Sequence, residues 1–178
     1  MKKLTITTLG LLSGLAVSSS AFAHPGHSTT ASFAEGFLHP LTGLDHLAAL
    51  ILMGVFAATC TKQVATKLVA FVCGALLAGF MIGVEWVHAS DAETLVMASL
   101  FVLPVSLLAY RFTGAVKMLA MIAMGGFSVC HGLVQGAEAQ GALFQYGFGT
   151  MVASLSVIVL SLLITKLVEA TARSMRVA

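Results

Sequence analysis

The chain has 178 residues, of which 58% are hydrophobic and 9% are charged, whereas about a quarter of the residues of an ordinary soluble domain are charged. This composition excludes a typical soluble domain and predicts a protein of the lipid bilayer. The nine Lys and Arg residues gather in no basic patch, so we expect no nucleic-acid partner. The three cysteines are scattered through apolar segments, which predicts free thiols and not a disulfide framework.

Residues 1–23 have the pattern of a secretory signal peptide. Two lysines follow the first Met, an apolar stretch covers residues 9–17, and Ala-Phe-Ala at 21–23 is typical of a cleavage site. The alternative, an uncleaved transmembrane helix, is disfavoured because the apolar stretch is short and ends in three serines. We therefore predict that the mature chain begins at His24, with a His-containing periplasmic leader over residues 24–39.

Five apolar segments follow, each near the roughly 20 residues that a helix needs to cross the hydrocarbon core. The loops between them are short, so consecutive helices should be antiparallel neighbours in one bundle. The sequence thus predicts an all-α, polytopic membrane helix bundle over residues 40–165, followed by a basic tail over 166–178. The predicted helices cover about residues 40–58, 68–87, 94–110, 118–135 and 142–165.

The basic residues predict the orientation, because Lys and Arg near membrane segments are held on the cytoplasmic side. If His24 lies outside, all seven basic residues of the mature chain lie inside, while the loops around Asp91 and Glu138 contain none. We expect a multi-pass protein of the bacterial inner membrane, with a periplasmic mature N-terminus and a cytoplasmic C-terminus. The seven residues are Lys62, Lys67, Arg111, Lys117, Lys166, Arg173 and Arg176.

Small residues at four-residue spacing indicate where helices approach closely. Gly79 with Gly83 and Gly132 with Gly136 should allow the second and fourth predicted helices to pack tightly against their neighbours. Pro40 is expected to open the first helix, where its missing N–H costs little.

Ionisable residues cluster at the start of the first segment, although such groups are costly at membrane depth. His39, Asp45 and His46 lie within eight residues. On a continuous helix, positions seven apart share a face and are separated by roughly 10 Å along the axis. Two ion sites in series are therefore expected, unless the helix unwinds near Pro40. Asp45 is expected to orient the ring of His46, as metal-binding histidines usually require.

The fourth segment carries a second pair at the same spacing, His131 and Glu138, with Gln135 between them on one face. Because the two helices run in opposite directions, His46 should face His131 at depth and His39 should face Glu138 nearer the surface. Imidazole and carboxylate groups suit nickel, cobalt, zinc and copper(II), and ligand type alone does not select among them. The alternative for His131 is a hydrogen bond in helix packing.

Further candidates lie on the predicted periplasmic side. His24 and His27 could capture a metal ion beside the new α-amine, or could be part of an ordinary leader. Glu85 and His88, three residues apart at the end of the second segment, could be ligands at the mouth of the pathway or solvated interfacial residues.

Residues 39–46 match every fixed position of a His-Pro-x-x-Gly-x-Asp-His motif, and the sequence here resembles the HupE/UreJ family of hydrogenase and urease accessory proteins. The family's second motif, Phe-His-Gly-x-Ala-His-Gly-x-Glu, is matched only in part, because Cys130, Val134 and Gln135 replace the Phe, the Ala and the second His. The resemblance implies Ni²⁺ or Co²⁺ as the transported ion and metalloenzyme maturation proteins as partners, and leaves a homo-oligomer open. It also implies that the metal-handling residues are His39, Asp45, His46, His131 and Glu138.

No phosphate-binding loop of the type Gly-x-x-x-x-Gly-Lys-Ser/Thr occurs in the sequence, so no nucleotide cofactor is expected from that motif. We predict a permease for a divalent transition metal and not an enzyme.

One alternative is an intramembrane hydrolase, in which His39, His46 and His131 hold zinc and Asp45 or Glu138 acts as the base. Another is an accessory protein that binds metal without transporting it. The hydrolase requires ligands that converge on one centre, whereas the expected axial separation favours transport.

Overall fold

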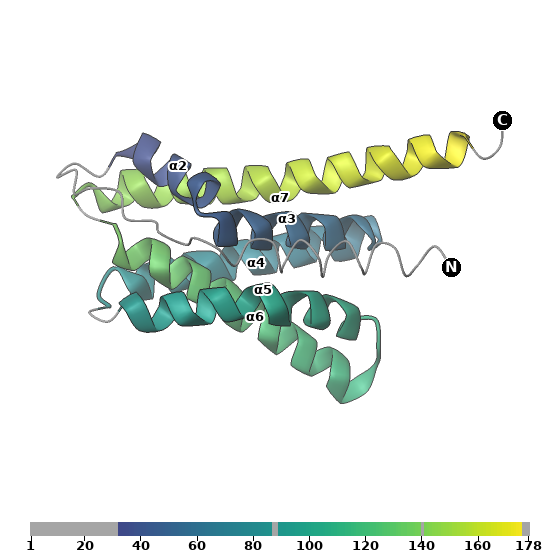
Figure 1. Ribbon diagram of the computed structural model, residues 1–178, viewed down its shortest axis with the longest axis horizontal. Coiled ribbons are helices and arrows are strands. Elements are labelled where there is room, and N and C mark those ends of the chain that lie inside the picture. The colour runs from purple at the N-terminus through teal and green to yellow at the C-terminus, as the bar shows by residue number, and fades with distance from the viewer. Residues whose placement is uncertain (1–31, 87–88, 140, 176–178) are drawn as a thin grey trace.

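The computed structural model describes residues 32–86, 89–139 and 141–175 (Figure 1). The predicted signal peptide and the leader histidines His24 and His27 lie outside these ranges. The described chain folds into helices only, which confirms the all-α prediction. The helices are α2 (Phe33–Thr42), α3 (Leu44–Ala58), α4 (Lys62–Gly83), α5 (Ala89–Ala109), α6 (Gly114–Ala137) and α7 (Leu143–Ser174).

The helices alternate in direction along the bundle. The connections α3–α4 and α5–α6 and the C-terminal end of α7 lie at one end, on the right of Figure 1, and the C-terminal ends of α4 and α6 lie at the other. Lys62, Arg111 and Arg173 all belong to the first end, which we call the basic end. The opposite end, which carries Glu138, is called the acidic end.

The distribution of polarity is that of a protein in lipid. Large apolar side chains cover the outside, including Phe144, which is 84% exposed. Polar side chains are instead packed inside, where a lipid-facing position would leave their hydrogen-bonding groups unsatisfied. The buried polar residues are His46, Ser99, Ser106, Ser128, His131, Gln135, Thr150 and Ser154.

Three helices of the described chain, α4, α6 and α7, are long and apolar enough to cross a membrane, and α2 with α3 makes a fourth span if the bent pair counts as one. The remaining predicted segment corresponds to α5, whose described apolar part, Val96–Ala109, is shorter. A helical membrane bundle is therefore the architecture of this chain.

The four predicted glycines form the contact between α4 and α6. A Cβ atom added to Gly79 or Gly83 would meet the backbone carbonyls of Val129 or Leu133, and one added to Gly132 would meet that of Leu76. Only a hydrogen atom fits between the two backbones at these positions. The prediction of close packing through these glycines is confirmed.

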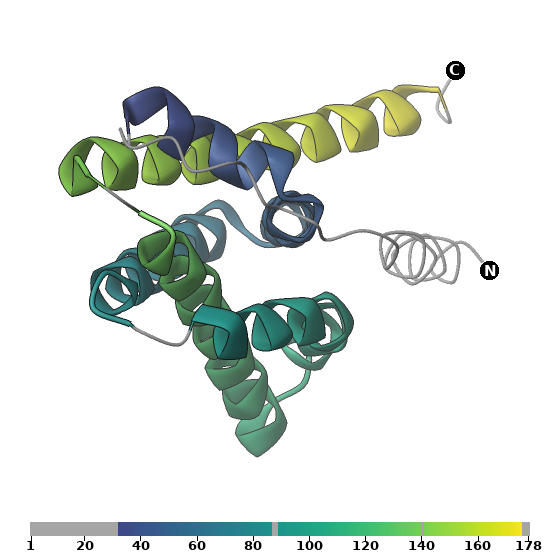
Figure 2. The same cartoon turned by 60° about the vertical axis from the view of Figure 1, so that its left-hand side comes forward.

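The start of the bundle differs from the prediction. Pro40 does not open a helix but lies inside α2, which begins at Phe33 after an N-terminal cap by Ser32. The expected leader boundary at 39/40 therefore falls within a helix, and α7 continues through the expected tail as far as Ser174. Helix α2 packs against the first turns of α7 (Figure 2), where Gly36 closely approaches the carbonyl of Tyr146.

Candidate metal-ion site

The first membrane segment is a broken helix, and the break creates the site. Gly43 adopts an extended conformation, with φ −74° and ψ 106°, so the path turns by 78° between α2 and α3. The Gly43 N–H still donates to the carbonyl of His39, at 3.1 Å. Because the carbonyl ends of helices carry partial negative charge, the C-terminus of α2 presents this charge beside the start of α3.

His39 faces α6 as predicted. Its Nδ1 lies 3.2 Å from Oε2 of Glu138, and its ring also lies beside that of Tyr146, with the centroids 6.1 Å apart. An ionised carboxylate can only accept, so Nδ1 carries the hydrogen and the lone pair of the neutral ring is on Nε2.

His46 and Asp45 form the second pair. Oδ1 of Asp45 accepts from the backbone N–H of His46 at 2.9 Å and lies 3.1 Å from its Nδ1. The carboxylate thus satisfies a free N–H in the first turn of α3 and leaves the neutral ring with its lone pair on Nε2. This geometry fits the predicted orienting role of Asp45.

His131 lies deepest and belongs to α6. Its ring is perpendicular to that of His46, with the centroids 4.9 Å apart, so the predicted facing of these two residues is confirmed. Its Nε2 lies 2.8 Å from Oγ of Ser99 on α5.

The predicted separation of His39 and His46 along a continuous helix is wrong, while the prediction of two ion sites in series stays a prediction. The rings of His39 and His46 have centroids 5.1 Å apart, about half of the separation expected on a straight helix. The 78° bend folds α2 back toward α3, so the three imidazoles form one continuous row. We call His39, His46 and His131, together with Asp45 and Glu138, the histidine cluster.

Four buried side-chain atoms lack a hydrogen-bond partner within the described chain: Nε2 of His39, Nε2 of His46, Oε1 of Gln135 and Oγ of Ser154. Imidazole nitrogens with an oxygen donor match the preferences of divalent transition metals. No group of three or more His, Cys, Asp or Glu residues among those described already has the spacing of a metal centre. Coordination by several of these groups at once therefore requires side chains to move toward the ion.

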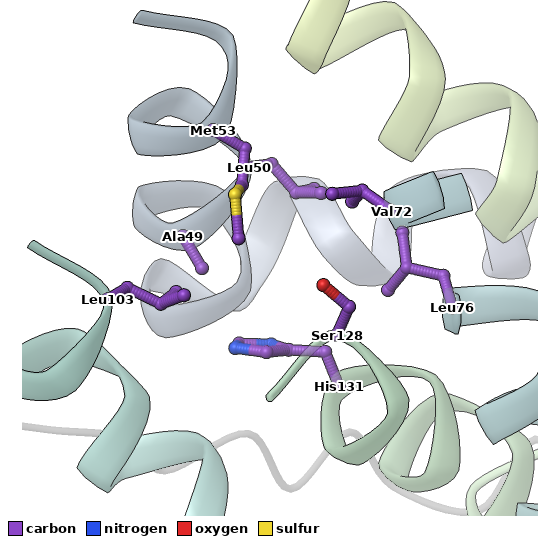
Figure 3. A pocket seen from close by; sticks show the side chains of 8 residues that line it. All are labelled: Ala49, Leu50, Met53, Val72, Leu76, Leu103, Ser128 and His131. Carbon is purple, nitrogen blue, oxygen red and sulfur yellow. The ribbon is translucent and has the colours of Figure 1, made fainter. Parts of the chain in front are cut away.

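A small cavity adjoins His131 on the side of the basic end. Ser128 and His131 project into it from α6, and side chains of α3, α4 and α5 close it (Figure 3). Its volume of about 10 Å³ is near the minimum that holds one water molecule. Apart from Ser128 and His131, the lining is apolar: Ala49, Leu50, Met53, Val72, Leu76 and Leu103.

The remaining candidates do not join the cluster in the described structure. Glu85 is exposed in the turn after α4, and His88, like His24 and His27, lies outside the described residues. Ser99 was not predicted, because nothing in the sequence distinguishes it from Ser106 on the same helix. Tyr146 was missed for the same reason, since an aromatic residue in an apolar segment is ordinary.

A membrane helix bundle with buried histidines that contact carboxylates at a broken helix defines a class of membrane protein with a candidate ion site, because ionisable groups at membrane depth are costly and usually functional. The family model of the HupE / UreJ protein matches residues 11–178. Protein HupE of Rhizobium leguminosarum bv. viciae is 34% identical over 142 residues, which are 78% of this chain and 70% of that relative. The chain belongs to the HupE/UreJ family, and no solved structure matches it.

Proposed function

We propose that this protein is a permease that carries a divalent transition metal, Ni²⁺ or Co²⁺, across the bacterial inner membrane from the periplasm to the cytoplasm. The observation that carries the proposal is the row of three imidazoles inside an apolar bundle, with centroid separations of 5.1 and 4.9 Å. Neighbouring rings at this spacing allow an ion to exchange one nitrogen ligand for the next without meeting bare hydrocarbon.

The entry is assigned to the acidic end. Glu138 lies there beside His39, and its side chain retains 30% exposure, against 6% for His46. A carboxylate at the more accessible end attracts the cation, and the deeper imidazoles then replace its water ligands. His24, His27, Glu85 and His88 are proposed to raise the local supply of ions before entry.

The orientation follows from the basic end, which faces the cytoplasm by the positive-inside rule. Two charges that move inward through about 100 mV gain roughly 4.6 kcal/mol, enough for accumulation of roughly a thousand-fold. Facilitated diffusion is therefore energetically sufficient. Reporter fusions after Lys62 and near Asp91 should report cytoplasm and periplasm respectively.

Membership of the HupE/UreJ family is the basis for proposing nickel supply to hydrogenase or urease maturation as the role of this transport. The experiment is uptake of Ni²⁺ and Co²⁺ into liposomes that contain the purified protein, with Zn²⁺ and Cu²⁺ as competitors. Uptake of nickel or cobalt that saturates supports the proposal. Equal flux into protein-free liposomes contradicts it.

A second candidate, an intramembrane zinc hydrolase, gains from one observation, namely that the three imidazoles lie closer together than the sequence predicts. The cavity beside them counts against it, because a volume of about 10 Å³ admits a water-sized body but no peptide or lipid chain. Asp45 and Glu138 also already engage His46 and His39, where a hydrolase needs one of them to activate water. A hydrolase assay on the liposome preparation separates the two functions.

A further inference from the structure

Ser99 connects α5 to the histidine cluster. It is fully buried, with 0% exposure, and its Oγ has two close neighbours. The carbonyl oxygen of Val96 lies 2.5 Å away, one turn earlier on α5, and Nε2 of His131 lies 2.8 Å away on α6.

The hydrogen atoms of this contact can be assigned from the chemistry of its members. A serine hydroxyl has one hydrogen, and a carbonyl oxygen can only accept, so the hydrogen of Ser99 is donated to Val96. Toward His131 the hydroxyl oxygen is then an acceptor, and Nε2 must carry a hydrogen. The lone pair of the neutral ring is consequently on Nδ1.

This arrangement is the reverse of the one at the other two histidines. His39 and His46 are held at Nδ1 by carboxylates and keep Nε2 for an ion. His131 is held at Nε2 by a neutral hydroxyl, so its Nδ1 lone pair is the one left for an ion. The partner of His131 also differs in charge from those of His39 and His46. The Ser99 hydroxyl is neutral, so it holds the ring without adding a third carboxylate near the ion.

We propose that Ser99 is a positioning residue for transport, which fixes the Nε2–H tautomer and the ring orientation of His131 so that Nδ1 receives the metal ion from His46. The proposal rests on the transport function above. The ion concerned is a divalent transition metal that accepts imidazole nitrogen. Loss of the outer partner of a metal-binding histidine typically costs 10–100-fold in affinity or activity.

The test compares Ser99→Ala with Ser106→Ala in the full-length protein. Ser106 is 5% exposed and lies two turns further along α5, so the control also removes a buried hydroxyl from the same helix. In metal-free protein labelled with ¹⁵N-histidine, with His131→Gln used to assign the signal, wild type and Ser106→Ala should show His131 protonated at Nε2 only. Ser99→Ala should show both tautomers, and Ser99→Thr, which keeps the hydroxyl, should restore one.

In liposomes, Ser99→Ala should raise the KM for Ni²⁺ by about 10–100-fold, while Ser106→Ala stays within about twofold of wild type. An unchanged His131 tautomer in Ser99→Ala, or an unchanged KM in correctly folded protein, overturns the role of Ser99. The proposed permease function is still supported in that case if the wild-type protein transports the metal and His46→Ala does not. If the wild-type protein itself transports no nickel or cobalt, the proposed function is wrong. The tautomer measurement then still shows whether Ser99 fixes the Nε2–H form of His131.

Discussion

The interior of the bundle has two parts of opposite chemistry. Toward the acidic end it holds three imidazoles, two carboxylates and the amide of Gln135. Toward the basic end it is almost entirely apolar, and we call Met53, Val72, Leu76, Leu103 and Met124 of its core the apolar plug. An ion bound in the first part is stabilised by nitrogen and oxygen donors, whereas the second part offers almost none. Under the proposed transport function, binding and release would be governed by different regions of the same bundle.

The largest expected effect comes from removing the central ligand of the polar part. His46→Ala should abolish nickel or cobalt uptake, because it breaks the row between His39 and His131. Asp45→Ala should lower uptake by about 10–100-fold, since it removes the group that orients His46. Liposome flux and protein abundance measure the two effects, and abundance should be nearly unchanged.

The matched control is Met121→Ala, a change on α6 at a residue that is 42% exposed on the outer face. It should transport like wild type. Normal uptake by both His46→Ala and Asp45→Ala at limiting metal would falsify the assignment of binding to the polar part.

The second effect concerns the framework that holds both parts together. Gly132→Ala places a Cβ against the carbonyl of Leu76 on α4, and overpacking of this kind costs about 1–3 kcal/mol. The apparent melting temperature in detergent should fall. Gly126→Ala on the same helix meets open space and should leave it unchanged or raise it. Equal melting temperatures for the two variants would show that α4 and α6 do not pack through these glycines.

Much of this architecture was predictable because hydrophobic runs, glycine spacing and charge each have a local signature. The pairing of His39 with Glu138 and of His46 with His131 also followed, since it requires only two antiparallel helices. The sequence left a break near Pro40 only as the exception, because residue spacing records which face a side chain lies on but not whether the helix continues. For this reason the sequence placed His39 and His46 too far apart. Ser99 was missed because its role depends on contact with another helix.

A smaller effect tests the apolar plug. Val72 is 2% exposed and lines the cavity beside His131, and Thr has nearly the same shape with a hydroxyl in place of one methyl group. If the cost of entering this apolar region limits release, Val72→Thr should raise the maximal Ni²⁺ flux a few-fold, because an oxygen donor offsets part of the desolvation cost. Val69→Thr, on the same helix and outside the cavity lining, serves as the control. A maximal flux that does not rise in Val72→Thr contradicts a barrier in this region.

The smallest expected effect adjusts the polar part without dismantling it. Gln135 is 1% exposed, and its Oε1 has no hydrogen-bond partner within the described chain. It lies one turn from His131 and three residues before Glu138 on α6, at a position where the family motif has His. Gln135→His replaces a neutral oxygen donor with imidazole nitrogen, a stronger ligand for nickel and cobalt. Both KM and maximal flux for Ni²⁺ should fall about two- to fivefold, because an ion that is held more tightly leaves more slowly. Gln135→Leu, which removes the donor and keeps a comparable volume, should raise KM instead. If both substitutions change KM in the same direction, the oxygen of Gln135 does not contact the ion, and the binding region ends with the three histidines.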